Sequence, residues 1–185
     1  MTTPAPESVV VRRVRTGELS ARDLAGLLDL FAACWPAGDF STEDIAHAMG
    51  GVHWLAIVRG RIIGHASVVP RLLEADGTPM TTGYVEAVAT HPDWRHRGIA
   101  SRLMTAANAH VAGTFELGAL STDLHPVYAR VGWERWRGPT FVRTDAGPLR
   151  PPDEDDGIMI LRTPATPPLT ATEALSCEWR AGDAW

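Results

Sequence analysis

The sequence contains no lysine, because all 17 of its basic residues are arginines. This excludes catalysis through a lysine Schiff base, attachment of pyridoxal phosphate and a P-loop lysine. Cysteine is nearly absent: only Cys34 and Cys177 occur, far apart and without a CxxC pair. A disulfide framework and a cysteine zinc site are therefore disfavoured, and we predict no metal site.

Long apolar runs are also missing, since none reaches the roughly 18–20 residues needed to span a bilayer. The first residues, MTTPAPESVVVRRV, show no charged segment before an apolar core and so do not resemble a secretory signal. We therefore expect a cytoplasmic protein that does not act at a membrane.

The charge of the chain is distributed unevenly. Residues 1–144 hold 14 acidic residues and 14 arginines, whereas residues 145–185 hold 8 acidic residues and 3 arginines and account for the whole net charge of −5. An acidic balance without a basic stripe argues against a nucleic-acid partner. The length of 185 residues suits a single domain over 1–185. Within it we expect residues 1–7 to be flexible and residues 145–185 to form an acidic loop, a strand and an extended tail.

The spacing of apolar residues predicts an α/β protein with a mostly antiparallel sheet. Helices are predicted over 21–34 behind the cap Ser20, behind the cap Ser41 or Thr42 as far as 49, after Trp94 as far as about 112, and over 123–131. Trp35-Pro36-Ala37-Gly38 is predicted to end the first helix. Strands are predicted at 8–14, 53–58, 62–72, 83–90, 116–121, within 133–143 and at 158–162, with hairpin turns at 59–61 and 76–77.

The most informative segment begins where the fourth predicted strand ends. The loop Arg95-His96-Arg97-Gly98-Ile99-Ala100 opens directly into an amphipathic helix. The first N–H groups of a helix lack partners within the helix, and glycine allows a close approach of the backbone, so this loop predicts a diphosphate site. The alternative is a helix start with a glycine nearby by chance. The preceding strand and the two arginines favour the anion site.

This loop resembles the acetyl-CoA-binding signature of the GNAT superfamily, Arg/Gln-x-x-Gly-x-Gly/Ala, which Arg95, Gly98 and Ala100 match. The resemblance implies the GNAT fold, a mixed, mostly antiparallel central sheet flanked by helices, with acetyl-CoA as co-substrate and no metal. It implies that the pyrophosphate binds to Arg95, His96, Arg97, Gly98, Ile99, Ala100 and Ser101. The pantetheine arm would lie along Ala87, Val88 and Ala89, where two neighbouring strands separate.

Glu86 is the candidate base. Strand alternation places it on one face with Val88, while Val85 and Ala87 point to the other face. A carboxylate in an apolar strand is costly to bury, and burial raises its pKa toward the range of a useful base. The alternative is a surface glutamate on an edge strand.

Tyr128 is the candidate acid, because in the GNAT superfamily a tyrosine on the corresponding short helix faces the sulfur of coenzyme A. The alternatives are a core tyrosine with a satisfied hydroxyl and stabilisation of the thiolate by backbone amides alone.

Several further segments resemble the aminoglycoside 2′-N-acetyltransferases over nearly the whole chain: 38–53, 83–88, 117–121, 128 with 132–133, 155–157 and 177–185. This resemblance implies acetyl transfer to the 2′ amine of an aminoglycoside, with Glu86 as base, Tyr128 as acid and a homodimeric enzyme. It implies a substrate site formed by Asp39, Glu86, Ser121, Asp155, Asp183 and Trp185 with its terminal carboxylate.

Taken by themselves, the acidic segments leave alternatives open. The run 153–156 also fits a solvated loop, and the tail also fits a disordered segment, although a terminal tryptophan is poorly suited to water. Two other functions remain: a GNAT enzyme for another cationic amine, such as a polyamine, a cell-wall amino sugar or another aminocyclitol antibiotic, and a binding module without catalysis. A 2′ assignment predicts turnover of drugs with a 2′ amine only.

Overall fold

The computed structural model describes residues 8–35 and 39–185. The expected flexibility of residues 1–7, and the part of the predicted helix stop that covers residues 36–38, lie outside the described residues. The described chain contains four α-helices: α1 (Ala21–Cys34), α2 (Thr42–Ala48), α3 (Ile99–Thr114) and α4 (His125–Ala129). No helix within these described ranges is long and apolar enough to cross a membrane.

Ten strands of the described residues form one sheet. They are β1 (Val10–Arg15), β2 (Val52–Val58), β3 (Arg61–Ala75), β4 (Thr78–Thr90), β5 (Leu117–Ser121), β6 (Glu134–Arg135), β7 (Thr140–Thr144), β8 (Gly147–Leu149), β9 (Ile158–Arg162) and β10 (Leu175–Glu178). The order is β6-β9-β5-β4-β3-β10-β7-β8, and β2 pairs with both β1 and β3. Only the pairs β4–β5 and β10–β7 are parallel, which confirms the expected mixed, mostly antiparallel sheet.

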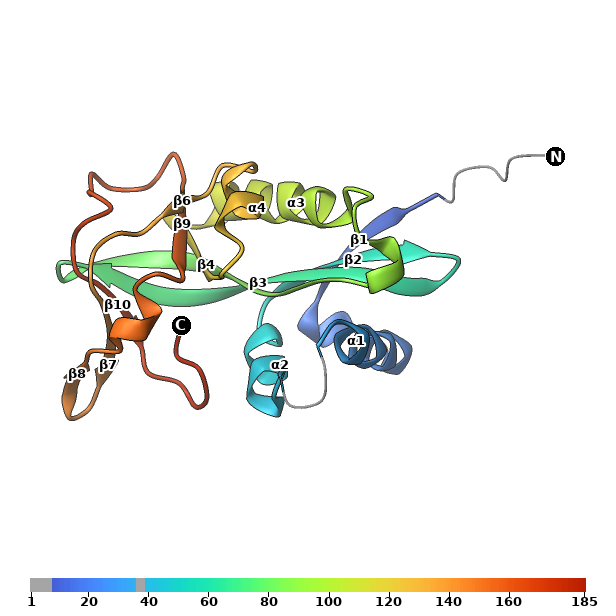
Figure 1. Cartoon of the computed structure of the whole chain (residues 1–185), viewed down its shortest axis with the longest axis horizontal. Coiled ribbons are helices and arrows are strands. Elements are labelled where there is room, and N and C mark those ends of the chain that lie inside the picture. The colour runs from blue at the N-terminus through green and yellow to red at the C-terminus, as the bar shows by residue number, and fades with distance from the viewer. Residues whose placement is uncertain (1–7, 36–38) are drawn as a thin grey trace.

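The helices cover both faces of this sheet. Figure 1 shows α3 and α4 on one face and α1 and α2 on the other. Serine capping boxes begin α1 and α2, because Ser20 accepts from the Asp23 amide and Ser41 from the Asp44 amide. The predicted start and cap of α1 are therefore confirmed, and Ser41 is the cap of α2.

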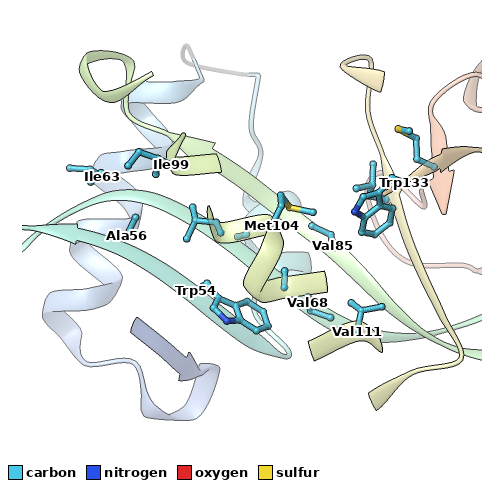
Figure 2. Close-up of a cluster of buried hydrophobic side chains, with 14 of the residues drawn as sticks. Trp54, Ala56, Ile63, Val68, Val85, Ile99, Met104, Val111 and Trp133 are labelled. Atoms are coloured by element: carbon cyan, nitrogen blue, oxygen red, sulfur yellow. The ribbon is translucent and has the colours of Figure 1, made fainter. Parts of the chain in front are cut away.

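The core beneath α3 joins this helix to the middle of the sheet. Figure 2 shows side chains of β2, β3 and β4, such as Trp54, Val68 and Val85, meeting Met104 and Val111 of α3. A second cluster, which includes Leu27, Leu30 and Phe31, packs α1 against the opposite face. The second half of β4 is therefore packed from both faces, by Val85 and Val88 on the α3 side and by Ala87 and Ala89 on the α1 side, which fixes the part of the strand that carries Glu86.

The C-terminal segment differs most from the sequence prediction, which had an extended tail after residue 162. Residues Leu175–Glu178 form β10, which enters the sheet between β3 and β7. The single strand predicted within 133–143 is instead divided into β6 and β7. Trp136 is buried between them, and Gly138 lies so close to the carbonyl of Glu173 that a Cβ there would clash at 1.8 Å.

The predicted alternation of side chains along β4 is wrong after Glu86. The register skips from Glu86, paired with Ser67, to Ala89, paired with His65, so two residues of β4 face one residue of β3. Ala87 takes a positive φ of 49° at this bulge. Consequently Val88 packs in the cluster under α3 together with Val85, while Ala87 packs on the α1 side.

Candidate active site

The centre of the site is a gap between the parallel strands β4 and β5. These strands pair only from Thr82–Leu117 to Tyr84–Ala119, although β4 continues to Thr90. A cavity of about 520 Å³ opens where the pairing stops. A smaller cavity of about 110 Å³ adjoins it and shares Val88, Leu124 and Tyr128 in its lining. The separation of two strands that the superfamily resemblance implied is thus present.

The loop predicted to hold a diphosphate lies at the outer end of the smaller cavity. Gly98 precedes α3 with φ 72° and no side chain caps the helix, so the first amides of α3 are left for another acceptor. Residues 95–98 are exposed, and the guanidinium of Arg97 lies 4.7 Å from the Trp94 ring centroid. Such an arrangement is suited to bind an anion.

The other predicted cofactor residues occupy different positions around this loop. Ile99 is buried in the core and anchors the helix start, whereas Ala100 and Ser101 line the smaller cavity. Ala87 and Val88 line the larger cavity. The side chain of Ala89 packs on the α1 side, so only its backbone faces the strand gap. Their contact with coenzyme A stays a prediction.

Glu86 lies in the larger cavity as an almost buried carboxylate. Arg180, from the C-terminal segment, donates from Nη1 to Glu86 Oε1 at 2.6 Å, and both side chains are about 15% exposed. Burial raises the pKa of Glu86, while the guanidinium of Arg180 and, more weakly, Arg71 and His47 oppose the increase. The alternative of a surface glutamate on an edge strand is therefore wrong.

Five of the six residues predicted to bind the substrate line this larger cavity: Asp39, Glu86, Ser121, Asp183 and Trp185. They come from the loop before α2, from β4, from the end of β5 and from the C-terminal segment. The sequence therefore correctly grouped residues that are up to 146 positions apart, although their contact with substrate stays a prediction.

Asp155 is the exception, because it does not line this cavity. It accepts from the amide and hydroxyl of Thr140 at 2.7 Å and from Arg150, which hold its pKa below the ordinary value. Burial and the charge of Asp183, a residue of the cavity lining, raise the pKa of the neighbouring Glu154. The resemblance thus pointed to a carboxylate that here holds β7 through Thr140, and its contact with substrate stays a prediction.

The sequence analysis missed five further ionisable residues that line the cavity: Asp44, His47, Tyr84, Asp123 and Arg180. Tyr84 is fully buried and its hydroxyl has no protein partner, although two guanidinium groups lie over the ring. Asp44 was assigned only to the first turn of α2. Its inward side became evident only once α2 was placed over the sheet.

The C-terminal segment closes one side of the cavity. Arg180 donates from Nε to the carbonyl of Asp183 at 2.8 Å, and His47 of α2 contacts the carbonyl of Ala181 at 2.8 Å. Trp185 is only 3% exposed and packs in the cluster around β10. The terminal residues are thus an ordered wall, which excludes the alternative of a disordered tail.

Tyr128 lies where the two cavities meet. Burial raises its pKa to about 12, so the hydroxyl keeps its proton over the whole neutral range. Asn108 of α3 fixes the loop after α4, because it donates to the carbonyl of Val131 and accepts from the indole of Trp133. The tyrosine thus presents a protonated hydroxyl at the junction of the two cavities, and its role as the acid stays a prediction.

Comparisons with known proteins agree with this geometry. Residues 49–135 match the family model of the acetyltransferase (GNAT) domain. The aminoglycoside 2′-N-acetyltransferase of Mycolicibacterium fortuitum is 39% identical over 178 residues, which cover 94% of this chain and 91% of that protein.

Solved structures share the fold at low identity. A GNAT family N-acetyltransferase from Escherichia coli in complex with CoA has a TM-score of 0.67 at 13% identity, covering 96% of this chain and 93% of that one. A GNAT family acetyltransferase from Brucella melitensis in complex with acetyl-CoA has a TM-score of 0.62 at 17% identity, covering 95% and 98%. The GNAT fold predicted from the sequence is confirmed, and the extent of the identity to the curated relative shows that the chain belongs to the aminoglycoside 2′-N-acetyltransferase family of GNAT enzymes.

Proposed function

We propose that this protein is an acetyl-CoA-dependent N-acetyltransferase that acetylates the 2′ amine of aminoglycosides. The observation that carries the proposal is the junction of the two cavities at Tyr128. The smaller cavity leads to the uncapped start of α3, and the larger one is lined by five side-chain carboxylates, those of Asp39, Asp44, Glu86, Asp123 and Asp183. An anionic thioester and a polycationic amine would therefore meet from opposite sides.

The loop of residues 95–101, which we call the anion loop, fits coenzyme A. Free helix amides and exposed arginines match a diphosphate, and the small residues Ala87 and Ala100 leave room beside the strand for a narrow arm. When bound, acetyl-CoA supplies the activated acetyl group. We assign Arg95, His96, Arg97, Gly98, Ile99, Ala100 and Ser101 to the pyrophosphate and Ala87, Val88 and Ala89 to the pantetheine arm.

Glu86 and Tyr128 would divide the proton transfers. Glu86 accepts a proton from the incoming ammonium, directly or through a water molecule, so that a neutral amine attacks the thioester carbonyl. The C–N bond forms, the attacking nitrogen releases its second proton to solvent, and the C–S bond breaks. Tyr128 donates its proton to the departing sulfur, which otherwise leaves as a thiolate. Acetylation removes one positive charge and one hydrogen-bond donor from the drug, so its affinity for ribosomal RNA falls and the bacterium becomes resistant.

Thiol release from acetyl-CoA across paired drugs tests the proposal. Gentamicin and tobramycin, which carry a 2′ amine, should give saturable release, and kanamycin A, which carries a hydroxyl there, should give little acetylation at this position. Equal turnover of both types would contradict the 2′ assignment. Turnover of spermidine or glucosamine with no turnover of gentamicin would favour another cationic amine as substrate. Binding of gentamicin without thiol release would favour a binding module.

We also propose that the enzyme is a cytoplasmic homodimer, as the family resemblance implies. Light scattering on the purified protein at micromolar concentration should give about twice the monomer mass of 20.0 kDa. A mass of one chain at this concentration would contradict the dimer. Fractionation of the source cells should recover the activity with the cytosol.

A further inference from the structure

Two buried histidines outside the cavity lining form a hydrogen-bonded chain that ends at the catalytic strand. His53 of β2 and His65 of β3 are both completely buried, and His53 Nδ1 lies 2.9 Å from His65 Nε2. His65 Nδ1 lies 2.7 Å from the carbonyl oxygen of Ala87. His53 Nε2 lies 2.8 Å from the hydroxyl of Thr16. We call these four residues the histidine relay.

The carbonyl at one end determines where every proton of the relay sits. A carbonyl only accepts, so His65 carries its proton on Nδ1, and its Nε2 is then an acceptor. His53 must therefore donate from Nδ1, and its Nε2 accepts from the Thr16 hydroxyl. Both rings are neutral in this arrangement. Burial agrees with it, because desolvation lowers the pKa of His53 to about 4 and that of His65 to about 3.

The residue at the end of the relay is the strained one in β4. Ala87 holds φ 49°, a left-handed conformation that is sterically unfavourable for an L-residue other than glycine. The carbonyl of the preceding residue, Glu86, is also held by a side chain of β3, because the hydroxyl of Ser67 donates to it at 3.2 Å. Side chains of β3 therefore fix two successive carbonyls of β4 at the bulge, where the main-chain ladder is interrupted.

The orientation of the Ala87 carbonyl also sets the next amide. A trans peptide holds its C=O and N–H in opposite directions, so the Val88 N–H points away from His65. Val88 lines both cavities at their junction, beyond the last paired residues of β4 and β5. An N–H directed into this gap suits the oxygen of a thioester carbonyl that gains negative charge during attack.

We propose that His65, supported by His53, is a positioning residue that locks the Ala87–Val88 peptide with its N–H toward the reacting carbonyl. The proposal rests on the proposed acetyl transfer for its effect on rate, but not for the proton positions in the relay. Neither ring touches substrate, and neither exchanges a proton during the reaction. Their role is to hold a strained peptide in the conformation that donates to the thioester.

The proton positions are tested on the unmodified protein by ¹⁵N NMR of the histidine side chains. Both rings should be neutral at pH 7 and protonated at Nδ1, and neither should titrate above pH 5. A proton on Nε2 of either His65 or His53 would overturn the relay. This measurement requires no activity, so it stands even if no aminoglycoside is acetylated.

Two substitutions test the consequence for β4. His65→Asn keeps a donor at the position of Nδ1, whereas His65→Leu removes it at similar volume. We expect a roughly 10–100-fold lower kcat for His65→Leu with little change in either KM, and a kcat within about threefold of the parent for His65→Asn. Equal losses in both variants, or an unchanged kcat in His65→Leu, would overturn the proposal.

The Val88 amide gives a second readout that needs no antibiotic. Its NMR resonance should shift when acetyl-CoA is added to the parent and to His65→Asn, and the shift should be lost in His65→Leu. Val142→Ala, a core truncation in β7, is the matched control for lost stability. It should lower the free energy of unfolding while keeping both kcat and the Val88 shift. A shift retained in His65→Leu would show that His65 does not orient this peptide.

Discussion

The ion pair between Arg180 and Glu86 leads to a specific prediction for Arg180→Leu. A cation within about 4–6 Å lowers a carboxyl pKa by roughly 1–3 units. Arg180 is the strongest of the three cations that oppose the effect of burial on Glu86, and it donates at 2.6 Å. Its removal leaves only Arg71 and His47 to oppose the effect of burial, so we expect the pKa of Glu86 to increase further.

The pH dependence of kcat/KM measures this shift, because it reports the groups of the free enzyme. The proposed base Glu86 acts only when ionised, so the acidic limb should move to higher pH in Arg180→Leu. The limb in kcat should move less, since the bound ammonium replaces the lost cation. The pH dependence of stability gives an independent test. A carboxyl whose pKa is higher in the folded than in the unfolded protein keeps its proton longer in the folded state, so the free energy of unfolding falls as pH rises between the two pKa values. This fall should extend to higher pH in Arg180→Leu.

Two control variants distinguish an effect of the lost charge from an effect of a displaced C-terminal segment. Arg180→Lys keeps the charge and should leave the limb near its parental position. Arg162→Leu removes an exposed ion pair with Glu134 far from the cavity and should change neither profile. An acidic limb that stays in place, or moves to lower pH, in Arg180→Leu would refute the electrostatic reasoning. Equal shifts in the Leu and Lys variants would assign the effect to a displaced C-terminal segment.

Three further variants separate the roles of the two cavities. Tyr128→Phe should lower kcat about 10²-fold without changing the acetyl-CoA KM, and an unchanged kcat would exclude the tyrosine as the acid. Deletion of Asp183–Trp185 should raise the gentamicin KM strongly and leave acetyl-CoA binding, measured by calorimetry, nearly intact. Gly98→Ala adds a Cβ that meets nothing within 4 Å but strains a φ of 72°, so acetyl-CoA affinity should fall about 5–30-fold at an unchanged gentamicin KM.

Sequence patterns predicted well the elements whose signals are local. The capping serine and apolar spacing located α1 to the residue, and the glycine loop was correctly placed at the start of α3, because both signals depend on neighbouring residues. The grouping of Asp39, Glu86 and Asp183 came from a family resemblance. No periodicity within the chain connects those positions, so physical reasoning from the sequence alone leaves them separate.

The features that escaped prediction depend on contacts between distant segments. The bulge at Ala87 has no glycine or asparagine to indicate it, and it is held by His65, which is 22 positions away. β10 is four residues long and becomes recognisable only through β3 and β7 on either side. The position of Asp155 outside the cavity lining has a related cause: it is one of four adjacent carboxylates, and its bonds to Arg150 and Thr140 turn it away from the cavity.

The acidic surplus of residues 145–185 takes on a different meaning with the fold in place. The same segment that brings Asp183 to the cavity also brings Arg180, which already neutralises the most buried carboxylate. A polycation entering this site would therefore compete with the guanidinium of Arg180 at Glu86. The ion pair of Arg180 does not involve the outer carboxylates, which are those of Asp39, Asp44, Asp123 and Asp183. We therefore expect binding at the rim and proton transfer at Glu86 to be separate events, in which the outer acids set affinity and an arriving ammonium displaces Arg180 from the proposed base.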